Sequence, residues 1–200
     1  MPSIRLASDA DGVALAAIYG PIVAATTISF EIDPPDASEM ARRVRESGPT
    51  YPWLVCERGR QVAGYAYASA HRARAGYRWS VDVSVYVGER FRRCGVGRGL
   101  YESLFAILAA QGFVSAFAGI ALPNPASIGL HEAMGFTPVG VYRNVGHKQG
   151  AWRDVGWWQL PLAAATTTPS PITPIPRLQQ AGNWDAIVSR GLVAMSGRGR

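Results

Sequence analysis

The chain has 200 residues, of which 48% are apolar, and this is enough to bury one good core. Its net charge is +6, of which the four arginines and one aspartate of residues 163–200 contribute +3. No stripe of Lys and Arg interleaves with aromatic residues, so we expect no nucleic-acid partner. Charged residues stand too early for a signal peptide and no apolar run is long enough for a membrane span, so we expect a cytoplasmic protein. The two cysteines form neither a metal set nor a disulfide framework.

The first third of the chain alternates strand and helix signals. Ser8 and Asp36 each stand three residues before an acidic residue, and this capping-box pattern predicts a helix start at both places. We expect Pro21 to end or kink the first helix and Gly48 to stop the second. Strands are predicted over residues 4–6, 53–57 and 61–70.

The middle of the chain continues the alternation. Leu100, Leu104, Ile107 and Leu108 have the spacing of a core-facing helix that Gly112 stops. A second helix is expected from the Asn124-Pro125 pair to Met134, with the asparagine as N-cap. Strands are predicted over 79–87, 113–121, 139–144 and 152–160, the last two as a hairpin. This order predicts an α/β fold with a mixed sheet.

Composition predicts a boundary after the hairpin. Residues 1–162 are expected to form one domain, and residues 163–176 are rich in Pro and Thr, which is typical of an extended, unpacked linker. Beyond it, Trp184, Ile187, Val188 and Met195 fit a short helix, which Gly191 weakens. We expect residues 163–200 to be a mobile tail, and docking of this helix is the alternative.

A short basic loop, rich in glycine, is the most informative feature. It joins the strand over 79–87 to the helix that carries Leu100. Gly95 and Gly97 let the backbone turn tightly and approach a ligand closely. The N–H groups at the start of a helix favour an anion, so the loop is expected to hold a pyrophosphate. The residues expected to form this site are Arg92, Arg93, Cys94, Gly95, Val96, Gly97 and Arg98.

The pattern Arg92-x-x-Gly95-x-Gly97 after an apolar strand resembles the acetyl-CoA loop of the GNAT superfamily of N-acetyltransferases. A second signature follows in the right order, in which Asn124-Pro125 begins a helix and Leu130-His131-Glu132 precedes Gly135-Phe136. Together with the segments 79–87, 148–155 and 158–159, these motifs resemble the phosphinothricin and methionine sulfoximine/sulfone N-acetyltransferases. The resemblance covers about residues 3–160.

The resemblance implies a GNAT fold, a mixed and largely antiparallel sheet flanked by helices, with acetyl-CoA as co-substrate. It also implies two catalytic residues. His131 occupies the place of the proton donor to the leaving thiolate, and Asp82 is placed to accept the amine proton directly or through water. The subfamily commonly has glutamate in place of Asp82 and arginine in place of Gly129. A satisfied structural aspartate and a histidine on a helix surface remain the alternative interpretations.

The resemblance also assigns binding residues. The backbone of Val85, Tyr86 and Val87 is expected to pair with the pantetheine arm, and Asn124 is expected to cap its helix and contact the same arm. Side chains alternate along a strand, so Tyr86 should point away from Val85 and Val87. The arginines of Arg72-Ala73-Arg74 can bind a carboxylate and a phosphinate or sulfoximine group. The substrate pocket is assigned to Phe30, Glu31, Arg72, Ala73, Arg74, Tyr77, Asp82, Val83 and Ser84.

The sequence therefore predicts N-acetylation of a small amino acid analogue. One alternative is another amine acceptor, such as a polyamine, an antibiotic or a peptide N-terminus, although two arginines disfavour a cationic acceptor. The other alternative is a non-catalytic acetyl-CoA-binding module. We expect no metal, and we expect a homodimer like those of the resembled subfamily.

Overall fold

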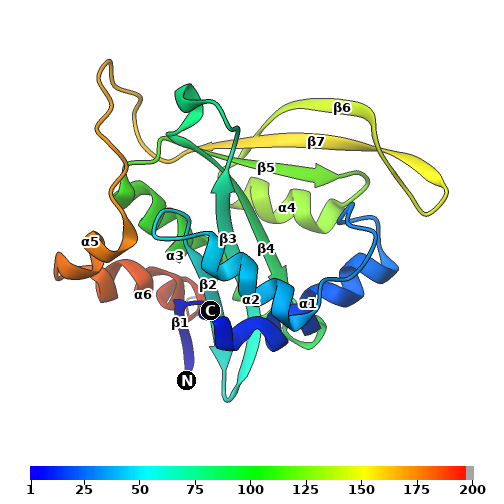
Figure 1. Ribbon diagram of the computed structural model, residues 1–200, viewed down its shortest axis with the longest axis horizontal. Helices are drawn as coiled ribbons and strands as arrows, with labels where there is room; N and C mark the ends of the chain where they lie inside the picture. The colour runs from blue at the N-terminus through cyan, green and yellow to red at the C-terminus, as the bar shows by residue number, and fades with distance from the viewer. Residues whose placement is uncertain (197–200) are drawn as a thin grey trace.

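The computed structural model describes residues 1–196, and it contains one seven-stranded sheet with the strand order β1-β2-β3-β4-β5-β7-β6 (Figure 1). The strands are β1 Pro2–Leu6, β2 Trp53–Arg58, β3 Gln61–Ala70, β4 Ser80–Val87, β5 Ser115–Ala121, β6 Thr137–Lys148 and β7 Ala151–Pro161. The α-helices are α1 Gly12–Ala25, α2 Ala37–Glu46, α3 Val96–Gln111, α4 Pro125–Ala133, α5 Ile175–Gln180 and α6 Trp184–Ser196. Short 3₁₀ turns are η1 Asp9–Asp11, η2 Ala75–Tyr77 and η3 Glu89–Phe91.

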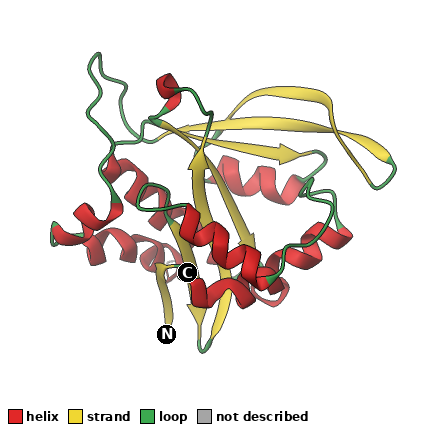
Figure 2. Cartoon of the chain, in the orientation of Figure 1, coloured by secondary structure: helices red, strands yellow, loops and turns green. Residues whose placement is uncertain are grey.

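Helices cover the two faces of the sheet (Figure 2). Helices α1 and α2 pack on one face through a cluster that includes Leu15, Met40 and Tyr65. On the other face, the apolar side of α3, including Leu100 and Leu104, packs against the sheet. Each face removes apolar surface from water, and this burial is the main stabilising contribution to the fold.

Strands β4 and β5 are the one parallel pair of the described sheet, and they pair over a short stretch. Ser80, Val81 and Asp82 face Ser115, Ala116 and Phe117, and beyond these residues the two strands separate. Every other pair of neighbouring strands is antiparallel. The predicted α/β class with a mixed, largely antiparallel sheet is confirmed.

The predicted helix starts are also confirmed. The Asp36 carboxylate accepts a hydrogen bond of 2.8 Å from the backbone N–H of Glu39. The Asn124 side chain accepts one of 3.1 Å from the N–H of Ser127. Pro21 does not end the first helix, because α1 continues through it to Ala25.

The tail differs from the predicted mobile segment. Helices α5 and α6 bury Leu178, Val188 and Met195 against the α3 face of the sheet, and Ile175 of α5 is buried as well. Helix α6 lies along α3, where the Ser103 hydroxyl donates to the carbonyl of Val188 at 2.6 Å.

The preceding segment is anchored as well. The indole of Trp79 donates to the carbonyl of Ser170 at 2.8 Å, and the N–H of Thr173 donates to Gln111 at 2.8 Å. Composition indicated an unpacked linker because few apolar residues stand there. The segment is held through its backbone carbonyl and N–H groups, and amino-acid composition does not reveal such backbone contacts. Residues 197–200, the end of the predicted tail, lie outside the described residues.

No helix within residues 1–196 is both long enough and apolar enough to cross a membrane. The same residues contain no group of three or more His, Cys, Asp or Glu side chains with the arrangement of a metal site. Both cysteines are free, and Cys56 is buried while Cys94 is exposed.

Candidate active site

The glycine-rich loop forms an open cradle at the start of α3. Arg93 and Gly95 adopt positive φ angles of 60° and 80°, and these turns direct the backbone into the helix. The N–H groups of residues 93–98 donate to no acceptor among the described residues, whereas the N–H of Gly99 bonds to the carbonyl of Gly95 at 2.9 Å. A row of free donors at a helix N-terminus is a site for an anion, because the helix dipole adds to the hydrogen bonds.

Gly97 stands where the cradle faces strand β4. A Cβ atom at this position would lie 3.3 Å from the Leu130 side chain and 3.6 and 3.9 Å from those of Val87 and Val85. A larger side chain would fill the space between the cradle and the strand. The absence of a side chain at Gly97 thus lets the cradle backbone lie close to Leu130 and to strand β4.

A cleft lies in the space where β4 and β5 separate. The predicted residues that line it are Val83, Ser84, Val85, Tyr86, Asn124 and His131, together with Ile28, Tyr101, Ser127 and residues 118–121. The structure therefore gathers cofactor residues from the predicted strand and from the predicted α4 helix. Tyr86 packs against the α1 cluster while Val85 and Val87 pack toward α3, so the predicted alternation is confirmed.

His131 lies on the α3 side of this cleft and is 4% exposed. Its Nε2 atom lies 2.9 Å from the Tyr101 hydroxyl, and its Nδ1 atom lies 2.8 Å from the carbonyl of Ser127. Burial lowers the pKa of His131, since the interior disfavours the charged imidazolium. The side chain is a neutral, fully bonded group in the cleft wall.

Asp82 lies on the other face of the sheet. Its side chain alternates with those of Val81 and Val83, which belong to the α3 cluster. The carboxylate is 2.6 Å from Nδ1 of His71, just after β3. Burial raises the pKa of Asp82, while the His71 contact opposes that shift. The two predicted catalytic residues therefore face the separation of the strands from opposite sides.

Aromatic side chains surround the Asp82 side of the cleft. His71 stacks on Phe117 with ring centroids 4.3 Å apart, and Tyr77 and Trp157 each stand edge-on to it at 6.0 Å. The Arg72 guanidinium lies 5.5 Å from the centre of the Trp157 ring. Of the predicted substrate residues, Arg72 and Tyr77 thus lie near the His71–Asp82 pair, and all four of Arg72, Ala73, Arg74 and Tyr77 are exposed.

The loop after α1 carries the remaining predicted pocket residues. Phe30 lies against Gly146 of the hairpin, where a Cβ would come within 2.5 Å of the ring. Glu31 accepts two hydrogen bonds from Arg43, at 2.8 and 2.9 Å. The ammonium of Lys148 donates to the carbonyl groups of Val23 and Ser29 at 2.6 and 2.9 Å, so the hairpin holds this loop in place.

Sequence reasoning did not assign His71 and Tyr101 to the site. A signal for His71 existed in the pairing of the predicted strands β3 and β4. In the structure Ser69 faces Asp82, so His71, two residues on, is the diagonal neighbour of Asp82 on the same face. Tyr101 carried no such signal, because its contact with His131 joins two separate helices.

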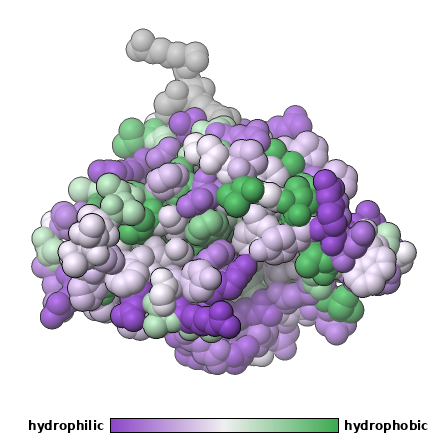
Figure 3. All heavy atoms as spheres, turned by 90° about the horizontal axis from the view of Figure 1, so that it is seen from above, coloured by the Kyte–Doolittle hydropathy of each residue, from purple (hydrophilic) through white to green (hydrophobic). Residues whose placement is uncertain are grey.

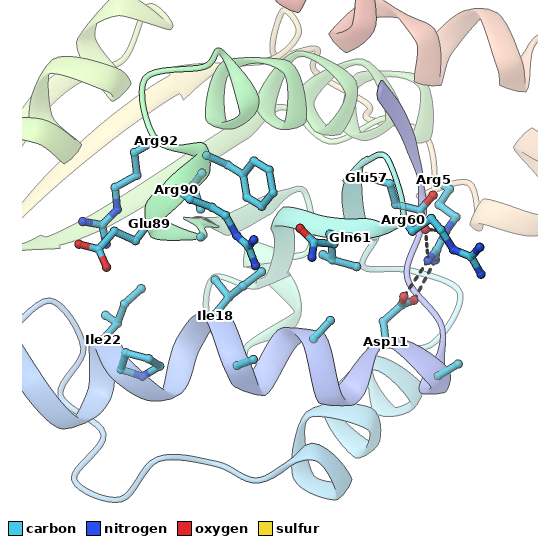
Figure 4. Close-up of a pocket in the computed structure, with 18 of the residues that line it drawn as sticks. Arg5, Asp11, Ile18, Ile22, Glu57, Arg60, Gln61, Glu89, Arg90 and Arg92 are labelled. Carbon is cyan, nitrogen blue, oxygen red and sulfur yellow. Dashed lines mark hydrogen bonds and ion pairs between the residues drawn. The ribbon is translucent and has the colours of Figure 1, made fainter. Parts of the chain in front are cut away.

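A second cavity, of about 1060 Å³, lies between α1 and the start of β3 (Figure 4). Arg92 and Glu89 stand at one end of it, and Arg5 joins Asp11 and Glu57 at the other. It contains neither Asp82 nor His131, and of the predicted cofactor residues it touches Val87 and Arg92. The chemistry is therefore assigned to the cleft between β4 and β5.

Comparison with known proteins gives the family. The sequence model of the acetyltransferase (GNAT) domain matches residues 4–157. A phosphinothricin N-acetyltransferase of Streptomyces viridochromogenes is 39% identical over 175 residues, covering 88% of this chain and 95% of that protein. An L-methionine sulfoximine/L-methionine sulfone acetyltransferase of Pseudomonas paraeruginosa is 37% identical over 169 residues, covering 84% of this chain and 98% of that protein.

The fold comparison agrees. The crystal structure of a phosphinothricin acetyltransferase from Sinorhizobium meliloti in complex with AcCoA has a TM-score of 0.81 to this chain, with 36% sequence identity. The similarity covers 87% of this chain and 96% of that one. The cradle, the cleft and these relatives confirm the resemblance that the motifs predicted: the chain belongs to the GNAT family of acetyltransferases.

Proposed function

We propose that this protein is an acetyl-CoA-dependent N-acetyltransferase that acetylates the amino group of a small amino acid analogue. Phosphinothricin, methionine sulfoximine and methionine sulfone are the substrate type, as the names of its relatives indicate. Such a reaction would detoxify the analogue. The observation that carries the proposal is the cleft where β4 and β5 separate, lined by residues 83–86, Asn124 and His131, with the free N–H groups of residues 93–98 in the loop that follows β4.

The cradle is the proposed site of the CoA pyrophosphate. The N–H groups of residues 93–98 would bind its oxygens, and Arg92, Arg93 and Arg98 add positive charge. The pantetheine arm would pair with the backbone of residues 85–87 beside Asn124. Bound there, acetyl-CoA supplies the activated acetyl group. We propose residues 1–162 as the catalytic domain, with α5 and α6 as an added support for α3.

We assign the two sides of the cleft to different proton transfers. The Asp82 side receives the acceptor amine and its proton, and the Tyr101–His131 side faces the leaving sulfur. Oriented groups on both sides of the reacting carbonyl would lower the barrier by alignment as well as by proton transfer. A cysteine nucleophile is not needed in this scheme.

The acceptor pocket is proposed around Arg72, Arg74 and Tyr77. A guanidinium beside the Asp82 carboxylate fits an amino acid, which carries an anion and an amine on one carbon. The Trp157 ring lies beside both Arg72 and His71, so it forms an apolar wall of the same proposed pocket. Phe30, Glu31, Ala73, Val83 and Ser84 complete the proposed wall.

We also propose a homodimer, in the cytoplasm, where acetyl-CoA is available. The hairpin of β6 and β7 carries a group of exposed apolar side chains. Figure 3 views the molecule from the side on which this hairpin lies and shows hydrophobic spheres among hydrophilic ones there. Exposed apolar surface of this kind is typical of an interface. The side chains are Val139 (58% exposed), Val141 (41%), Tyr142 (49%), Val145 (51%) and Trp152 (63%).

Thiol release tests the function directly. The protein is mixed with acetyl-CoA and, in turn, phosphinothricin, L-methionine sulfoximine, L-methionine sulfone, spermidine, an aminoglycoside and a peptide with a free N-terminus. We expect turnover with the amino acid analogues. Turnover with the cationic amines alone would reject the substrate class. Binding of acetyl-CoA with no turnover on the whole panel would reject the enzyme and support a binding module.

A further inference from the structure

The His71–Asp82 contact lies at the point where the cleft begins. Asp82 and Phe117 are the last residue pair before β4 and β5 separate. The His71 ring bridges this pair, since its Nδ1 atom is 2.6 Å from the Asp82 carboxylate and its plane stacks on Phe117 at 4.3 Å. An imidazole ring fixed by both a hydrogen bond and a stacked neighbour has a defined orientation.

That orientation settles which nitrogen is free. A carboxylate accepts hydrogen bonds, so Nδ1 carries the proton that faces Asp82, and Nε2 holds a lone pair. Nε2 makes no hydrogen bond to any of residues 1–196, and the side chain is 13% exposed. A half-buried carboxylate behind Nδ1 stabilises the imidazolium that forms when Nε2 takes a proton.

We propose that His71 is the general base of the acetyl transfer, and that Asp82 orients the His71 ring and stabilises its protonated form. This inference rests on the proposed function and assigns its proton acceptor to a side chain not named above as catalytic. The charged and titratable groups that face the ring are Asp82 from β4, Arg72 from the adjoining loop and Tyr77 from η2. Phe117 and Trp157 supply the apolar contacts from β5 and β7.

The proton balance of the step is simple. Nε2 of His71 takes one proton from the ammonium group of the acceptor, and the neutral nitrogen attacks the thioester carbonyl carbon. The new C–N bond forms as the C–S bond breaks, and the sulfur leaves with that electron pair. The second proton of the nitrogen reaches the sulfur on the Tyr101–His131 side of the cleft, and the third stays in the amide. His71 returns its proton to solvent, so the products are the amide, the CoA thiol and one proton.

The test uses the full chain, acetyl-CoA and L-methionine sulfone, with thiol release followed from pH 5.5 to 9. His71→Phe keeps an aromatic ring to stack on Phe117 and removes the base. We expect kcat to fall at least a hundredfold, with the acidic limb of the wild-type pH profile lost. Acetyl-CoA binding, measured by titration calorimetry, should stay within twofold. His147→Phe, which removes an exposed histidine on the hairpin, is the matched control and should keep the wild-type pH profile.

Two further variants separate a base from a structural residue. Asp82→Asn keeps an oxygen that Nδ1 can bond to but removes the negative charge, so the acidic limb should move to lower pH and kcat should fall less than in His71→Phe. His71→Ala should regain part of its turnover when imidazole is added, which a lost packing contact would not allow. Wild-type turnover with an unchanged pH profile in His71→Phe would overturn the inference and leave Asp82 as the direct acceptor. The proposed function fails separately, if the wild-type protein itself releases no thiol with any amine.

Discussion

The hydroxyl of Tyr101 on α3 donates a hydrogen bond of 2.9 Å to Nε2 of His131 on α4. The direction of this bond follows from the other ring nitrogen, because Nδ1 faces the carbonyl of Ser127 at 2.8 Å and a carbonyl can only accept. His131 therefore has no proton of its own to give along Nε2. Tyr101 also lines the cleft, so the two side chains form one unit in its wall.

The first prediction concerns this pair. His131→Phe should lower turnover about a hundredfold, with little change in acetyl-CoA affinity, because the variant removes the group that positions the Tyr101 hydroxyl. Tyr101→Phe should lower turnover to a similar extent. The double variant should be little worse than either single variant, since residues that act as a unit are not additive. Near-normal turnover in both single variants would return the pair to a structural role.

The second prediction is a pH dependence of stability. Burial lowers the pKa of His131 from its usual 6.5, so the unfolded chain binds a proton that the folded chain excludes. Stability from this group is complete above about 6.5 and falls as the pH drops below it, until the folded pKa is reached. Thermal unfolding from pH 8 to 5 should show a steeper loss for the wild type than for His131→Gln. An equal loss of Tm with falling pH in the two proteins would contradict this prediction.

The third prediction concerns the cradle. Acetyl-CoA at a hundredfold excess over its dissociation constant should stabilise the protein by about 2.7 kcal/mol, seen as a raised Tm. Gly97→Val should abolish this shift, because its side chain would press on Leu130, Val85 and Val87 and displace the cradle backbone from β4. Gly129→Ala is the matched control, since nothing lies within 4 Å of its Cβ. It should keep the shift and be about 1 kcal/mol more stable without ligand. A wild-type Tm that millimolar acetyl-CoA does not change would refute the assignment.

The fourth prediction concerns the acceptor. Arg72→Ala should raise KM for an anionic amino acid analogue about ten- to a hundredfold, the cost of about 1.5–3 kcal/mol for a lost charge-assisted hydrogen bond. Arg74→Ala should have a smaller effect, because Arg72 is the one that lies over Trp157 and near Asp82. KM for acetyl-CoA should stay the same in both. Arg78→Ala, which removes a guanidinium stacked on Trp79, is the control. Unchanged kinetics in the Arg72/Arg74 double variant would favour a cationic acceptor.

The fifth prediction concerns the tail. Truncation after Leu162 should lower Tm sharply, because it exposes the surface of α3 that α6 covers, and each fully buried apolar side chain contributes about 1.5–3 kcal/mol. Gly191→Val should act in the same direction within the full chain, since its Cβ would lie 2.0 Å from the carbonyl of Gly99. Val193→Ala, at a position 73% exposed, should leave Tm unchanged. A truncated protein with the wild-type Tm would show that α6 adds nothing to the fold.

The sequence by itself determined the features that depend on near neighbours along the chain. Asp36 and Asn124 cap their helices because each bonds to an N–H three residues on. Gly95 takes a positive φ that other residues avoid, so the turn into α3 could be read from its identity. These local rules, with the motifs they produce, were enough for the fold and the family.

Only the tertiary structure decided the contacts between distant segments. The His71–Asp82 pair depends on the register of β3 and β4, and the Tyr101–His131 bond depends on how α3 and α4 pack. Helix α6 docks because Gly191 and Gly99 let two helices approach closely, although Gly191 taken alone predicts a weak helix. A glycine lowers the intrinsic stability of its helix but can allow that helix to pack closely against another. Which effect dominates depends on a neighbour that is distant in the sequence.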